Sequence, residues 1–250
     1  MRESFILSPN LPQNRVSLVL VSCRIKEITD ELARLGIKYI DPGCLSGISG
    51  SERFHADMNI CHIGNNKLFC AQNSSVHGSE LQNAGFELIH TDTPVTARKP
   101  GLNICMIGKN VLCDTKTADP KLMSVLKSEG KTILHTNQMY ARCSTAIAAE
   151  NAVMTSDPSI YELCRKNGID VLRIAPGYIT LDGYAYGFIG GCCGLISKDT
   201  LAFSGSITRH PDCENIRSFA GNYGIKTISL SDAPLCDIGG ILPVKEFSVE

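Results

Sequence analysis

A short apolar segment that follows a glycine recurs five times along the chain. In each copy the glycine stands at the end of a helical pattern, and glycine readily takes the left-handed conformation that ends many helices. One such site is commonplace, but five at similar intervals indicate an internal repeat. The copies predict a helix end followed by a strand at residues 35–40, 84–89, 129–134, 167–172 and 223–228.

Three of the helix starts repeat as well. A capping residue followed by proline is typical of the first helical turn, and it occurs as Asp119-Pro120, Asp157-Pro158 and His210-Pro211. These pairs predict helices at residues 121–129, 159–167 and 212–223. A further helix at residues 25–35 is indicated by an apolar stripe at helical spacing, made by Ile28, Leu32 and Leu35.

Two short apolar runs joined by a polar turn precede four of the predicted helices. Such pairs are typical of β-hairpins. They stand at residues 59–63 with 67–70, 103–107 with 111–113, 145–149 with 152–155, and 193–197 with 200–204.

The fifth copy is split between the two ends of the chain. Residues 241–249 supply its first strand or hairpin, and residues 16–22, 25–35 and 38–40 supply the rest. Sharing one blade between the ends would close a ring and leave no long free sheet edge. We therefore expect an α/β fold in a single domain of residues 1–250. This domain would be a five-bladed ββαβ propeller with pseudo-five-fold symmetry, closed by the N- and C-terminal segments.

Composition narrows the function classes. Hydrophobic residues make up 43% of the 250 residues and charged residues 20%, as in globular domains. A net charge of -1 without a basic stripe argues against a nucleic-acid partner. No apolar run reaches the roughly 18 residues of a membrane span, and the run at residues 18–21 is too short for a signal peptide. We expect a cytoplasmic protein without a membrane partner.

The chain has 12 cysteines but no CxxC pair. A structural zinc site therefore has little support, and we expect no metal and no cofactor. Most of these cysteines lie in apolar strand patterns and are interpreted as small buried hydrophobes. Cys192 and Cys193 stand next to each other between glycines, which leaves a thiol-based redox or metal protein as a minor alternative.

The candidate chemistry lies just before the predicted first strands, where side chains of different copies could meet. His55-Ala56-Asp57 precedes one such strand, Arg142-Cys143-Ser144 precedes another, and Asp237 precedes two glycines in the split copy. Lys99 holds the corresponding place in the second copy.

Five ββαβ units resemble the pentein superfamily, which includes arginine deiminase, agmatine deiminase, dimethylarginine dimethylaminohydrolase and non-catalytic members. Its enzymes attack a guanidinium carbon with a cysteine, assisted by a histidine and acidic residues. His55 with Asp57 is similar to the family's HxD element. Cys143 is similar to its nucleophile, and Asp237 to its orienting acid. The resemblance implies Cys143, His55 and Asp237 as catalytic residues.

The order of these residues departs from the family. Its acid, histidine and cysteine follow one another along the chain, whereas His55, Cys143 and Asp237 would require a circular permutation. An unpermuted alignment places Cys236 at the family's C-terminal cysteine. That alignment makes Asp57 a substrate acid and puts Arg142 or Ser144 where the histidine belongs, as in an inactive or altered enzyme. Cys236, Cys192 and Cys193 are therefore alternative thiols.

The resemblance implies a guanidine-modifying hydrolase or amidinotransferase acting on a small arginine-like ligand. Asp57 would hold the cationic guanidinium. Arg142 and Lys99 would face the ligand's other end, where an amino acid carries its carboxylate. Whether the chain is an enzyme stays open at this level, because a non-catalytic pentein-fold binding module with a degenerate centre is the alternative. The enzyme requires His55 and Cys143 to meet in one pocket.

Overall fold

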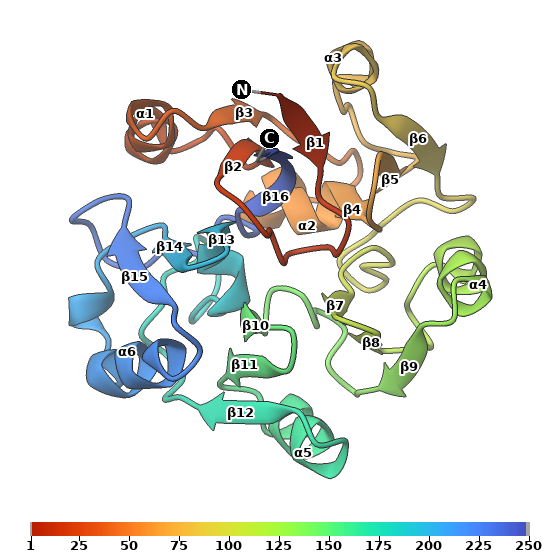
Figure 1. Ribbon diagram of the computed structural model, residues 1–250. Helices are drawn as coiled ribbons and strands as arrows, with labels where there is room; N and C mark the ends of the chain where they lie inside the picture. The colour runs from red at the N-terminus through yellow and green to blue at the C-terminus, as the bar shows by residue number, and fades with distance from the viewer. Residues whose placement is uncertain (1, 249–250) are drawn as a thin grey trace.

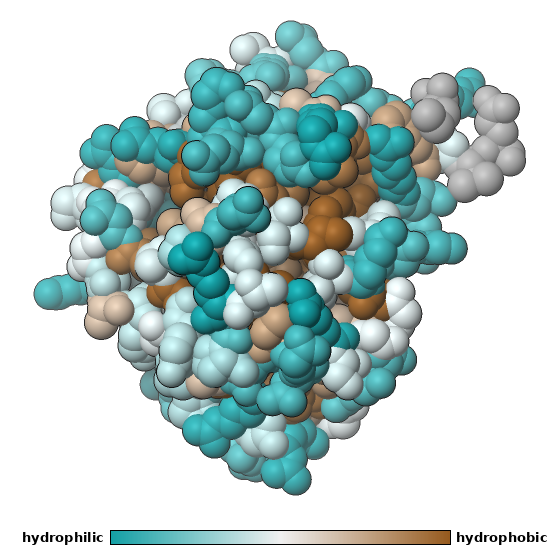
Figure 2. Space-filling model, turned by 90° about the vertical axis from the view of Figure 1, so that its left-hand side faces the viewer, coloured by the Kyte–Doolittle hydropathy of each residue, from teal (hydrophilic) through white to brown (hydrophobic). Residues whose placement is uncertain are grey.

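The computed structural model describes residues 2–248. The chain has a mixed α/β fold with five small sheets. Figure 1 shows the sheets placed around a common centre with the longer helices at the periphery. In Figure 2, hydrophilic and intermediate side chains cover most of the face that is turned to the viewer, and apolar residues lie between them. No helix in the described part of the chain has the length and apolarity that crossing a membrane requires.

Four sheets repeat one unit of strand, strand, helix and strand. Within each sheet the first two strands are antiparallel, and the third returns through a helix to pair in parallel with the second. The four predicted hairpins are confirmed. The strands are β4 (Ile60–His62), β5 (Lys67–Cys70), β6 (Glu87–His90), β7 (Cys105–Ile107), β8 (Asn110–Cys113), β9 (Thr132–His135), β10 (Ala146–Ala149), β11 (Ala152–Thr155), β12 (Asp170–Arg173), β13 (Cys193–Ser197), β14 (Thr200–Phe203) and β15 (Lys226–Ser229).

The fifth sheet joins the two ends of the chain. Its order is β1 (Glu3–Phe5), β16 (Leu242–Phe247), β2 (Val16–Leu20) and β3 (Lys38–Ile40). The predicted sharing of one sheet by residues 16–22 and 241–249 is confirmed, although Val249 lies outside the described residues. The edge strand β1 was not predicted, because its three residues are too few to show an alternating pattern.

Of the three helix starts predicted from a capping residue and a proline, two are confirmed. The described residues form six α-helices. They are α1 (Lys26–Arg34), α2 (Ala56–Asn59), α3 (Gly78–Asn83), α4 (Pro120–Ser128), α5 (Pro158–Lys166) and α6 (Cys213–Gly221). The Asp119 and Asp157 side chains accept hydrogen bonds from backbone N–H groups in the first turns of α4 and α5. The exception is α6, which begins after Pro211, with Asp212 at its N-cap and no side-chain cap.

The repeated glycines have the predicted left-handed conformation. Their φ angles lie between 69° and 91° at Gly36, Gly85, Gly130, Gly168 and Gly224. Each helix therefore ends where the local sequence permits the reversal, and the following strand returns to its sheet. The strands β4, β7, β10 and β13, which open the four complete units, are almost wholly buried. The polar groups that precede these strands are consequently held in the interior.

Candidate active site

His55 and Asp57 lie at the start of the short helix α2, immediately before β4. His55 is the N-cap of α2, and Asp57 lies in its first turn. Asp57 is only 2% exposed, and its backbone N–H donates to the Gly239 carbonyl oxygen over 3.2 Å. The split sheet and the β4 sheet are thus connected at the HxD element, and both side chains are held in the interior.

Cys143 lies in the segment between β9 and β10 and is held by Asn103. The Asn103 Oδ1 atom accepts hydrogen bonds from the backbone N–H groups of Arg142 and Cys143, at 2.9 Å and 3.2 Å. Its Nδ2 atom donates to Cys143 Sγ over 3.2 Å. One buried amide therefore fixes both the backbone and the sulfur of the candidate nucleophile.

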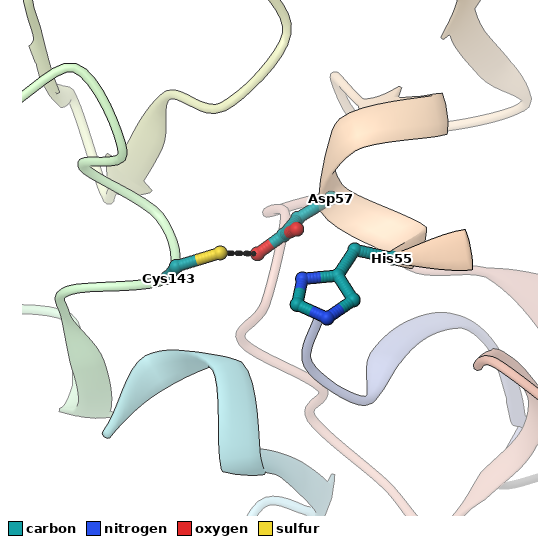
Figure 3. Close-up of side chains that lie close together, drawn as sticks. All are labelled: His55, Asp57 and Cys143. Atoms are coloured by element: carbon teal, nitrogen blue, oxygen red, sulfur yellow. Dashed lines mark hydrogen bonds between the residues drawn. The ribbon is translucent and has the colours of Figure 1, made fainter. Parts of the chain in front are cut away.

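The three side chains His55, Asp57 and Cys143 converge (Figure 3). Each offers a nitrogen, oxygen or sulfur atom within 4.8 Å of the others. The Cys143 thiol donates a hydrogen bond to Asp57 Oδ2 over 2.8 Å. Asp57 Oδ1 is buried and has no hydrogen-bond partner in the described part of the chain. The cluster therefore combines a thiol, a free carboxylate oxygen and an imidazole.

Asp237 lies behind the imidazole in the position of an orienting acid. Its Oδ1 atom is 3.6 Å from His55 Nδ1. The carboxylate accepts hydrogen bonds from the backbone N–H groups of Phe188 and Gly239, each over 3.0 Å. These donors hold the carboxylate in place beside the imidazole of His55.

Glycine is required where the backbone closes on this carboxylate. A Cβ atom built on Gly191 would overlap Asp237 Oδ1, and one on Gly239 would overlap His55. The Gly191 carbonyl also accepts the backbone N–H groups of Ile238 and Gly240. The absence of a side chain at Gly191 and Gly239 therefore allows two sheets to meet at Asp237.

Replacing Gly191 by alanine is expected to displace Asp237 and destabilise the fold. Overpacking of this kind costs roughly 1–3 kcal/mol of unfolding free energy. Gly221→Ala is the matched control, because nothing lies within 4 Å of a Cβ built at that position. Urea unfolding should show a loss for Gly191→Ala and none for Gly221→Ala. Equal stability of the two variants would contradict the close packing.

A cavity of about 290 Å³ opens onto the cluster. Its polar lining residues are Glu52, His55, Cys143 and Asp237, and the rest of the lining is Tyr140, Leu181, Tyr184, Ala185, Tyr186 and Phe188. His55 and Cys143 thus line the same cavity. Asp57 does not line it but lies behind Cys143, where it lines a smaller cavity of about 20 Å³.

Burial controls the protonation of the cluster. It raises the pKa of Asp57 to about 6, while His55 opposes this rise and Asp237 adds to it. Burial, together with the negative charges of Asp57 and Asp237, raises the pKa of the Cys143 thiol well above its usual value. In the free protein at neutral pH, the thiol is therefore protonated and Asp57 is mostly ionised.

Arg142 and Lys99 do not line the main cavity. The buried Arg142 guanidinium donates to the backbone carbonyl oxygens of Gly190 and Thr145 at 3.1 Å and 3.4 Å, and it lines the smaller cavity. Lys99 lies in a tight turn that its backbone closes with Thr96. The Arg142 guanidinium thus joins the segments that precede β10 and β13, a role that its place beside Cys143 did not indicate.

The alternative thiols have different surroundings. Cys192 and Cys193 are buried, and each thiol donates to the Ile189 carbonyl oxygen over 3.1 Å. Cys236 is half-buried and lines a neighbouring cavity of about 400 Å³, which also includes His55 and Asp237. Among the alternatives, Cys236 alone therefore lies in a cavity that contains both the histidine and its acid.

Sequence reasoning missed three residues of the site. Asn103 was expected to open a strand, but it stands before β7, two residues before Cys105, and its side chain holds Cys143. Its place before the first strand of its unit was the available signal. Glu52 and Tyr184 carried no signal, because Glu52 lies in a 3-10 helix of four residues and Tyr184 in an irregular segment, and neither segment shows a periodic pattern.

His55, Asp57 and Cys143 are also donor types that a transition metal such as zinc accepts. A metal would have to replace the proton that the thiol and the carboxylate share. In this structure the thiol and the carboxylate instead contact each other directly, at 2.8 Å.

Comparisons with known proteins give a family for this chain and several solved structures with a similar fold. A family model described as "Family of unknown function (DUF6873)" matches residues 20–242. A search of curated proteins finds no match. Among solved structures, the inosamine-phosphate amidinotransferase StrB1 from Streptomyces griseus is similar, with a TM-score of 0.60, 12% identity and 98% coverage of each chain.

Two further structures give the same result. The amidinotransferase SxtG from Microseira wollei, of the saxitoxin biosynthetic pathway, has a TM-score of 0.60 and 10% identity, with 98% of each chain covered. The agmatine deiminase of C. jejuni has a TM-score of 0.53 and 11% identity, covering 98% of this chain and 97% of that one. These proteins are penteins, so the pentein resemblance is confirmed for the fold.

Proposed function

We propose that this chain, which belongs to the family of unknown function DUF6873, is a guanidine-modifying hydrolase or amidinotransferase with Cys143 as its nucleophile. The observation that carries the proposal is that Cys143 and His55 line one cavity while Asp57 and Asp237 contact them. We also propose that the five sheets are the blades of a closed propeller, in a single domain of residues 1–250.

The proposed reaction passes through a covalent intermediate. The Cys143 thiol proton passes to Asp57, the sulfur bonds to the guanidinium carbon, and His55 protonates the nitrogen whose bond to that carbon breaks. Water or an acceptor amine then attacks the carbon and gives its proton to His55. The carbon–sulfur bond breaks, and the thiolate regains its proton from Asp57.

A cationic ligand would itself activate the thiol. The charges that raise the pKa of Cys143 are the carboxylates of Asp57 and Asp237. A guanidinium bound beside them opposes their effect and favours the thiolate. Asp57 does not line the main cavity, so in this proposal it receives the thiol proton and does not hold the guanidinium directly. The nucleophile would therefore form mainly when the ligand is present.

The fold neighbours support this reaction class. Two of them are named as amidinotransferases and one as an agmatine deiminase. In this chain the proposed ligand is a small guanidino compound, and the proposed compartment is the cytoplasm. The formal net charge of -1 supports the expectation that nucleic acid is not a partner.

Alkylation by a cationic reagent tests the proposal. Chloroacetamidine carries a planar amidinium, whereas chloroacetamide has the same leaving group and a similar size but is neutral. We expect chloroacetamidine to modify Cys143 selectively, and chloroacetamide to modify it slowly, because the free thiol is buried and protonated. Mass mapping of wild type, Cys143→Ala and Cys236→Ala locates the adduct.

The outcomes separate the two proposed functions. An adduct that disappears in Cys143→Ala and persists in Cys236→Ala supports the enzyme. An adduct on Cys236 would support the unpermuted alignment. If no cysteine reacts faster with the cation than with chloroacetamide, the nucleophile is not cation-activated. That result would favour a binding module, which the protonated Cys143 thiol also fits.

A further inference from the structure

A second carboxylate, besides that of Asp237, lines the same cavity and has no role in the proposed reaction. Glu52 stands in the short 3-10 helix Ser51–Phe54, is only 4% exposed and lines the cavity together with Cys143 and His55. Its Oε1 atom accepts a hydrogen bond from the Tyr184 hydroxyl over 2.5 Å. Its Oε2 atom is buried without a hydrogen-bond partner in the described part of the chain.

No cation neutralises Glu52 from within the protein. Among residues 2–248, no lysine, arginine or histidine forms an ion pair with it. A buried carboxylate with a free oxygen is costly unless a cation or further donors reach it. Since Glu52 faces the cavity, the missing partner can be supplied by a ligand.

Tyr184 fixes this carboxylate without neutralising it. The hydrogen bond to Glu52 raises the pKa of the Tyr184 hydroxyl to about 12, so the phenol stays protonated and donates. The Tyr184 side chain belongs to the segment that supplies Leu181, Ala185, Tyr186 and Phe188 to the cavity wall. One hydroxyl therefore joins this wall to the acid.

The remaining charges of the cavity exclude a ligand carboxylate. Its lining includes Glu52 and Asp237 but no lysine or arginine, and Arg142 and Lys99 lie elsewhere. An α-amino acid would bring its own carboxylate into this negative cavity without a counter-charge. An ammonium group, in contrast, would meet the free oxygen of Glu52 and the faces of nearby aromatic rings.

We propose that Glu52 and Tyr184 form a second cation-binding subsite, so that the ligand is a guanidinoalkylamine with two positive charges rather than an arginine-like amino acid. This inference rests on the proposed function for the guanidinium end. The apolar wall between the two ends, including Tyr140 and Phe188, suits the methylene chain of such a ligand.

Calorimetric titration of the full chain carrying Cys143→Ala, which removes turnover, tests the subsite. The probes are agmatine, 1-butylguanidine, arginine and 1,4-diaminobutane. Agmatine and butylguanidine differ by the terminal amine, so their affinity ratio measures the second subsite. We expect agmatine to bind about tenfold or more tightly than butylguanidine, as charge-assisted hydrogen bonds allow. Arginine should bind more weakly than agmatine.

Two variants and a control show which residues provide the extra affinity for agmatine. Glu52→Gln should reduce the agmatine affinity about tenfold and leave butylguanidine within about twofold. Tyr184→Phe removes only a hydroxyl from a side chain that is 51% exposed, so it should fold, and it should weaken agmatine selectively but less. Asp182→Asn is the matched control, because this exposed acid lines the neighbouring cavity and not this one.

The contrary outcomes distinguish failure of the second subsite from failure of the proposed guanidine function. Equal affinities for agmatine and butylguanidine, or an equal loss of both in Glu52→Gln, would overturn the second subsite and leave the proposed function standing. Tighter binding of arginine than of agmatine would do the same. Diaminobutane binding as tightly as agmatine, with its loss in Glu52→Gln, supports the subsite and overturns the guanidine function. Failure of all four probes to bind overturns both.

Discussion

Cys143→Ser is expected to abolish turnover of a guanidino substrate, lowering its rate on the order of 10⁴-fold or more, as loss of an enzyme nucleophile typically does. The serine hydroxyl can keep the contacts with Asp57 and Asn103, but it is a far weaker nucleophile than a thiolate at neutral pH. The measurement follows the loss of agmatine by chromatography, with thermal unfolding to show that the variant folds.

Two further cysteine variants make this result specific. Cys44→Ser is the matched control, because Cys44 is half-buried and lies outside both cavities. It should change the rate less than about twofold. Cys236→Ser discriminates between the two alignments, since Cys236 lies in the cavity next to His55 and Asp237. Full activity in Cys143→Ser, with loss of activity in Cys236→Ser, would overturn the assignment of the nucleophile.

Asp57→Asn is expected to stabilise the folded protein at neutral and alkaline pH. Burial raises the pKa of Asp57 from 3.8 to about 6, so between these values the folded state keeps a proton that the unfolded state has lost. The free energy of unfolding therefore falls as pH rises through this window and stays lower above it. The difference corresponds to at most roughly 3 kcal/mol at about 1.36 kcal/mol per pKa unit.

Urea unfolding at pH 4 and pH 8 measures this effect. Asparagine removes the buried charge and can still accept the Cys143 thiol. The variant should therefore gain roughly 2–3 kcal/mol at pH 8 and little at pH 4. Asp232→Asn, at an exposed acid, serves as the control and should show no such pH dependence. A variant that is less stable than wild type at pH 8 would show that the ionised carboxylate contributes net stability. The same variant should lose turnover, because an asparagine amide cannot take the proton of the Cys143 thiol.

Local sequence determined the repeated units. The five glycines end their helices in the left-handed conformation, and Asp119 and Asp157 cap the helices that follow them. These features depend on φ preference and on contacts within a few residues, so they could be predicted without knowledge of the surroundings. The candidate residues His55, Cys143 and Asp237 were found in the same way, as short motifs before predicted strands.

The contacts that each of these side chains makes depend on the tertiary structure. Cys143 meets Asp57 across 86 residues and Asn103 across 40, and no local pattern encodes such distances. The segments that carry these residues are irregular or, for Asp57, a helix of four residues, so no helical or strand period shows which way their side chains point. In the packed structure Asp57 accepts the Cys143 thiol and lies outside the main cavity, Arg142 donates to backbone carbonyl groups, and Glu52 lines the main cavity. The sequence alone therefore determined the elements and the chemistry available to the site. Only the packing of the sheets against one another determined the charge of the cavity, and with it the kind of ligand that the site can hold.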